Sequence, residues 1–105
     1  MSDILTQIAQ VIEQRKTAAA AESYVASLLR QGNDGILKKI GEEAAEVIIA
    51  AKNPDRGAVI HEVADLWFHT LILLASMDLG PEDVLKELQA RHGVSGLAEK
   101  ASRNR

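Results

Sequence analysis

A chain of 105 residues has the length of a single domain, which we expect to span residues 1–105. Its 47% hydrophobic and 26% charged residues are typical of a soluble globular protein, and its net charge of −3 gives no reason to expect nucleic acid. Because cysteine is absent, disulfides and thiolate metal sites are excluded. The N-terminus does not resemble a signal peptide, and the longest apolar run, Leu71 to Ala75, is too short to span a bilayer. We therefore expect a cytoplasmic location and no membrane partner.

Apolar residues recur at helical spacing and no stretch alternates as a strand would, so we predict an all-α antiparallel bundle of about five helices. The first two helices are expected at about residues 3–15 and 22–30. Gly32 should end the second helix, and Asn33 or Asp34 should cap the third. The second helix is predicted to turn inward Tyr24, Val25, Leu28 and Leu29. Tyr24 fits either the core or a contact with substrate.

The next two helices, expected at about residues 35–52 and 58–78, are joined by a short turn that favours an antiparallel hairpin. Both have segments that are apolar on nearly all sides. We expect the second half of the earlier helix to be buried, and the later helix to form a subunit interface. A fifth helix should begin at Pro81. Its inward residues are predicted to be Val84, Leu85 and Leu88. A basic tail follows at about residues 94–105.

Acidic residues three positions apart occur on both helices of the predicted hairpin. Glu43 with Glu46, and Glu62 with Asp65, each project from one side of a helix. In an antiparallel hairpin the two pairs fall at similar heights, so four carboxylates could converge. Oxygen ligands favour a hard cation, Mg²⁺ or Mn²⁺, which suits a polyphosphate substrate. Glu42 points to another side of its helix.

Other interpretations of these side chains stay open. The carboxylates could simply be solvated, or paired with nearby lysines. A di-iron bundle would need Glu-x-x-His pairs, but Ile49 follows Glu46 and Asp65 follows Glu62 at that spacing. His69 could be a metal ligand or a phosphate contact, but we favour a partly buried structural histidine, and we expect His61 at the surface.

The pattern Glu-Glu-x-x-Glu, a spacer and Glu-x-x-Asp resembles the all-α NTP pyrophosphohydrolase superfamily, which includes MazG-type and dimeric dUTPase-type enzymes. Within it, four stretches resemble the phosphoribosyl-ATP pyrophosphohydrolase family: residues 22–32, 36–47, 62–69 and 91–103. One departure is Val25, where the family usually has threonine.

The resemblance implies a homodimer that uses Mg²⁺ to hydrolyse 1-(5-phosphoribosyl)-ATP to phosphoribosyl-AMP and pyrophosphate, the second step of histidine biosynthesis. It implies as metal ligands Glu43, Glu46, Glu62 and Asp65, and as catalytic residues Glu42, Glu43 and Glu46, with Glu42 either a ligand or a general base. It implies as phosphate contacts Lys38, Lys39, Lys100 and Arg103. The alternatives are a house-cleaning nucleotide pyrophosphohydrolase with the same metal site, and a non-catalytic helical dimerisation module.

Overall fold

The computed structural model describes residues 2–92, which are helical and contain no strand. The elements are α1 (Ser2–Arg15), the 3-10 turn η1 (Ala20–Glu22), α2 (Tyr24–Gln31), α3 (Asn33–Ala51), α4 (Arg56–Ser76) and α5 (Pro81–His92). The prediction of an all-α protein with about five helices is thereby confirmed. The predicted basic tail at residues 94–105 lies outside the described residues.

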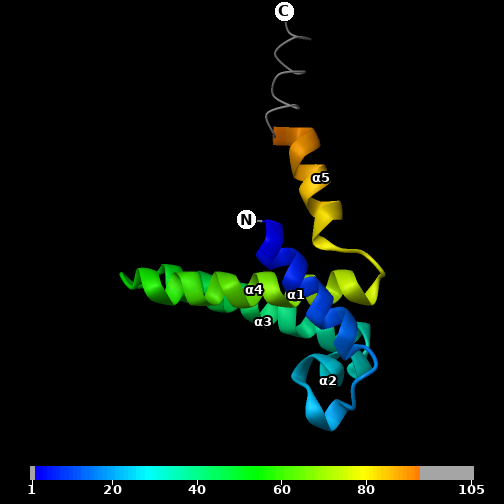
Figure 1. The fold of residues 1–105 in the computed structure, drawn as a ribbon. Coiled ribbons are helices and arrows are strands. Elements are labelled where there is room, and N and C mark those ends of the chain that lie inside the picture. Colours follow the sequence, from blue (N-terminus) through cyan, green and yellow to red (C-terminus); the bar gives the residue numbers. More distant parts are fainter. Residues whose placement is uncertain (1, 93–105) are drawn as a thin grey trace, which may run out of the picture.

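Helices α3 and α4 lie side by side as an antiparallel hairpin that forms the long axis of the bundle (Figure 1). Asp55 caps α4, since its Oδ1 accepts a hydrogen bond of 3.1 Å from the backbone N–H of Ala58. This cap starts α4 at Arg56, two residues earlier than predicted. The hairpin inferred from the short turn is confirmed.

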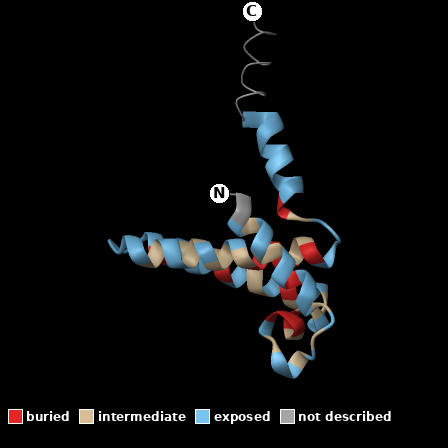
Figure 2. Ribbon diagram, in the orientation of Figure 1, coloured by how far each residue is buried: buried red, intermediate tan, exposed pale blue. Residues whose placement is uncertain are grey.

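Buried side chains gather where α1 and α2 cross one end of the hairpin (Figure 2). The core consists of Ile12, Val25, Leu28, Ile36, Leu71, Ile72 and Ala75. The other end of the hairpin is uncovered, because Ile48 and Ile49 are 62% and 57% exposed and Ile60 is 70% exposed. The prediction that the second half of α3 is buried is therefore wrong for the single chain.

Helix α2 is delimited by two caps. The Oγ of Ser23 accepts a hydrogen bond of 3.2 Å from the backbone N–H of Ala26, so the helix begins at Tyr24 and Glu22 falls in η1. Gly32, with φ +83°, ends the helix as predicted, and its N–H donates to the carbonyl of Leu29. No side chain caps α3. The predicted cap, Asn33 or Asp34, is wrong, because α3 begins at Asn33 directly after Gly32.

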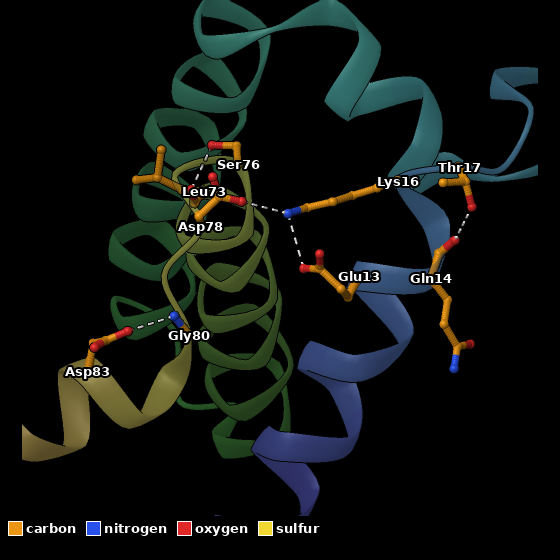
Figure 3. A network of polar contacts seen from close by, with 9 residues as sticks. All are labelled: Glu13, Gln14, Lys16, Thr17, Leu73, Ser76, Asp78, Gly80 and Asp83. Carbon is orange, nitrogen blue, oxygen red and sulfur yellow. Dashed lines mark hydrogen bonds and ion pairs between the residues drawn. The ribbon is translucent and has the colours of Figure 1, made fainter.

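A polar network joins the end of α1 to the turn before α5 (Figure 3). The Nζ of Lys16 lies 3.1 Å from Glu13 Oε2 and 3.3 Å from Asp78 Oδ1. Asp83 Oδ2 accepts a hydrogen bond of 2.9 Å from the N–H of Gly80 at the start of α5. Helix α5 follows this turn and projects away from the hairpin (Figure 1). The predicted inward face of α5 is therefore wrong for the single chain: Val84, Leu85 and Leu88 are exposed.

Helix α4 is long and apolar enough, by length and composition, to cross a membrane. The packing of α4 in the bundle also accounts for its apolar composition. One face supplies Leu71, Ile72 and Ala75 to the core, and another carries Glu62 and Asp65. The helix therefore combines a face in the core with an acidic face.

Candidate metal centre and active site

Three potential ligands lie together within one turn of α4. The ligand atoms of His61, Glu62 and Asp65 are all within 4.8 Å of one another. Glu62 and Asp65 are half-buried and His61 is exposed, with its Nε2 3.5 Å from Asp65 Oδ2. The spacing of the two acidic residues predicts that they lie together. His61 was expected only as a surface residue, although its position four residues before Asp65 is a signal for this contact.

On α3, the buried carboxylate of Glu43 is paired with a lysine. Glu43 is 9% exposed, and its Oε1 lies 3.5 Å from the Nζ of Lys39. The same ammonium lies 3.5 Å from Glu42 Oε1. Because a buried charge without a partner is costly, Lys39 is the cation that compensates Glu43 in this state.

The predicted convergence of four carboxylates is incomplete in the single chain. Glu62 and Asp65 are brought together, but Glu43 and Glu46 do not join their ligand group. Glu46 is exposed on α3. The described residues thus form two acidic groups, one on each helix of the hairpin, rather than one closed site.

Tyr24 lies between these two groups. Its hydroxyl is 2.7 Å from Nε2 of His69, whose Nδ1 is 2.7 Å from the carbonyl oxygen of Asp65. Burial raises the pKa of the Tyr24 phenol, and Glu43 and Asp65 raise it further, against an opposing effect of Lys39. The hydrogen bonds of His69 to the Tyr24 hydroxyl and to the Asp65 carbonyl place the beginning of α2 next to the acidic residues of α4.

Lys39 keeps its positive charge in this setting. Partial burial alone would lower the pKa of its ammonium, but Tyr24 and the carboxylate of Glu43 outweigh burial and raise it. Lys38, the neighbouring candidate for a phosphate contact, is exposed on the same helix. Lys100 and Arg103 lie outside the described residues.

The donor atoms on α4 fit a divalent cation. Carboxylate oxygens are the ligands that Mg²⁺ and Mn²⁺ prefer, and Mn²⁺ also accepts an imidazole such as that of His61. His69 does not fit as a ligand, because both of its ring nitrogens make hydrogen bonds and it is 5% exposed. This agrees with its interpretation as a structural histidine.

A helical hairpin with acidic groups on both helices is the arrangement that the resemblance to the all-α NTP pyrophosphohydrolases predicts. The family model described as phosphoribosyl-ATP pyrophosphohydrolase matches residues 5–92, and the chain belongs to this family of hydrolases. It is 58% identical to the phosphoribosyl-ATP pyrophosphatase of Methylococcus capsulatus, over 96% of each chain. It is 59% identical to that of Neisseria gonorrhoeae, over 95% of this chain and 94% of the relative. For the enzyme of Geobacter metallireducens the identity is 55%, over 96% and 93%.

Proposed function

We propose that this chain hydrolyses 1-(5-phosphoribosyl)-ATP to phosphoribosyl-AMP and pyrophosphate, the second step of histidine biosynthesis. The observation that carries this proposal is the ligand group of Glu62 and Asp65 on α4, within a chain that matches the family over residues 5–92. The names of the relatives, at 55% to 59% identity over nearly their full length, support the substrate.

The proposed cofactor is Mg²⁺, with Mn²⁺ as the alternative. Glu62 and Asp65 would hold it from α4, and Glu43 and Glu46 from α3. A metal held there supplies a Lewis acid that polarises the phosphoanhydride and lowers the pKa of a bound water. For Glu43 to serve as a ligand, the ammonium of Lys39 must move away from its carboxylate.

The remaining side chains are proposed to take the proton from the attacking water and to bind the phosphates. We assign catalytic roles on α3 to Glu42, Glu43 and Glu46. The prediction that Glu42 points to another side of the helix is wrong, because its Oε1 lies 3.5 Å from the same Lys39 ammonium that contacts Glu43. Its exposed carboxylate, on the side of the proposed ligands, is available as a general base. Lys38 and Lys39 would hold phosphate oxygens, and Lys39, once released from Glu43, would carry a full charge to them. Lys100 and Arg103 are proposed as further phosphate contacts from the tail.

The proposed assembly is a homodimer, supported by the apolar surface of the single chain. A groove of about 600 Å³ lies between α1, α4 and α5, lined by apolar side chains that include Leu5, Phe68 and Leu85. Trp67, in the same groove, is 59% exposed. Such a surface is typical of an interface. We also propose a cytoplasmic location, with neither nucleic acid nor membrane as a partner.

The test is pyrophosphate release from phosphoribosyl-ATP, measured beside a panel of NTPs and dNTPs. We expect preference for phosphoribosyl-ATP and a requirement for Mg²⁺. Glu46→Gln and Asp65→Asn should abolish turnover with the helical circular dichroism unchanged, whereas Glu87→Gln, on an exposed carboxylate of α5, should not. Preference for an ordinary nucleotide would assign the chain to the house-cleaning enzymes. Full activity of both variants would refute the proposed site, and a wild type that releases no pyrophosphate from any of these substrates would favour the non-catalytic dimerisation module.

A further inference from the structure

One buried histidine, His69, has no part in the proposed mechanism, and it makes two short hydrogen bonds. It is 5% exposed, and it contacts Tyr24, the single tyrosine of the chain, across 45 positions of sequence. The two rings meet edge to face, with centroids 5.7 Å apart and planes at 81°. Tyr24 begins α2 and is 52% exposed. A half-exposed phenol is therefore fixed beside the acidic groups by a buried partner.

The direction of both hydrogen bonds follows from the carbonyl at one end. The oxygen of Asp65 can only accept, so Nδ1 of His69 carries the proton of that 2.7 Å bond. In the neutral imidazole this is the one ring proton. Nε2 therefore has a free lone pair. It accepts the hydroxyl proton of Tyr24 at 2.7 Å.

The consequence is that Tyr24 has no proton left to donate. Its hydroxyl has one hydrogen, and His69 holds it. The lone pairs of the phenol oxygen remain, at a place where the charges of Glu43, Asp65 and Lys39 all act on it. A phosphate oxygen is itself an acceptor and gains nothing from such a group, whereas an O–H donor does.

We propose that Tyr24 is a substrate-reading residue whose oxygen accepts a hydrogen bond from an O–H group in the occupied site, and that His69 fixes this polarity. The donor is either a ribose hydroxyl of the nucleotide or a water on the metal. This inference depends on the location of the site in the proposed function. His69 acts through Tyr24 and is a positioning residue.

Tyr24→Phe removes the oxygen and keeps the ring, so we expect kcat/KM to fall about tenfold, the loss typical of one hydrogen bond. His69→Leu frees the hydroxyl proton and should cause a similar fall. His69→Gln offers a donor for the Asp65 carbonyl and an acceptor for Tyr24, and should restore most of the activity. The double variant Tyr24→Phe, His69→Leu should be no worse than either single variant, because both remove the same interaction.

The two donors are distinguished by the constants that change in Tyr24→Phe. A higher KM for phosphoribosyl-ATP with an unchanged Mg²⁺ activation constant identifies a ribose hydroxyl, and a changed activation constant identifies a metal-bound water. If Tyr24→Phe lowers only the melting temperature and leaves both constants unchanged, the bond is structural and the inference is wrong. If Asp65→Asn stays active, the fault lies in the proposed site instead.

A spectroscopic measurement tests the same contact without any substitution of His69. Because the chain has one tyrosine, labelling with 3-fluorotyrosine gives one fluorine resonance, that of Tyr24. Saturating phosphoribosyl-AMP with Mg²⁺ should shift this resonance. An unshifted resonance in protein that is active and saturated would overturn the inference.

Discussion

Replacing Lys39 with methionine should destabilise the metal-free protein and increase its response to Mg²⁺. The Nζ of Lys39 lies 3.5 Å from Glu43 Oε1, and Glu43 is the one buried carboxylate among the described side chains. Methionine keeps much of the apolar stem of lysine while it removes the charge. The substitution therefore isolates the ion pair.

The magnitude follows from the burial of Glu43. A buried carboxylate that loses its partner costs about 1 to 3 kcal/mol. In a domain of about 100 residues, 1 kcal/mol moves the melting temperature by roughly 4 to 8 °C, so a loss of about 2 kcal/mol predicts a fall of roughly 8 to 16 °C. Mg²⁺ at about 100 times its Kd adds back about 2.7 kcal/mol. In Lys39→Met the metal displaces no ammonium from Glu43, so Mg²⁺ should raise the melting temperature of this variant by more than it raises that of the wild type.

Thermal unfolding in EDTA and across a Mg²⁺ titration measures both effects. Lys38→Met is the matched control, because Lys38 is exposed on the same helix and makes no ion pair within residues 2–92. Its melting temperature in EDTA should stay close to that of the wild type. An equal Mg²⁺-induced rise in wild type and Lys39→Met would refute the reasoning, since it would mean that Lys39 and the metal do not share Glu43.

Three further outcomes follow from burial and charge. Ile72→Ala, at a side chain with no exposed surface, should lower the free energy of unfolding in urea by about 2 to 5 kcal/mol, and Glu87→Gln, at an exposed position of α5, should change it by less than about 0.5 kcal/mol. Trp67→Glu should lower the mass measured by sedimentation from dimer to monomer. The hydrogen bond to Glu13 raises the pKa of Lys16 above its usual 10.5. The contribution of Lys16 to stability is therefore complete below pH 10.5 and is lost as the pH rises through the pKa of the folded state. The free energy of unfolding of Lys16→Gln, measured in urea at a series of pH values, should fall less steeply above pH 10.5 than that of the wild type.

Local signals in the sequence predict much of the fold. The helical period of apolar residues, the position of Gly32 and the short turn after α3 each depend on residues within a few positions of one another. The cap at Asn33 or Asp34 was wrong because Gly32 already ends one helix where the next begins. The one residue between the two helices is this glycine, which has no side chain to serve as a cap.

Burial was harder to predict than helices. The apolar residues Val84 and Leu88 of α5, and Ile48 of α3, form helical faces in the sequence but are exposed in the single chain. A period shows which residues share a face and does not show what covers that face. That depends on how α5 leaves the bundle, and the contacts near its start, such as the one between Lys16 and Asp78, join residues 62 positions apart.

In the candidate site, too, contacts within one helix could be predicted from the sequence and a contact between helices could not. The spacing of Glu62 and Asp65 predicts that they lie together, because both are on one turn of α4. The contact between Tyr24 and His69 joins α2 to α4, and helical periodicity contains no information on such a pair. Tyr24 was predicted to lie in the core or to contact substrate; at 52% exposure it is not a core residue, and the contact with substrate stays a prediction.

The uncovered end of the hairpin connects these observations. Glu62 and Asp65 are half-buried in the single chain, and Ile60 and Ile48, on the same part of the hairpin, are exposed. A second copy that covers the isoleucines in the proposed dimer would also remove water from the nearby carboxylates. Desolvation makes clustered negative charge more costly and a bound cation more favourable. Dimerisation and metal binding should therefore strengthen each other, because they act on the same carboxylates.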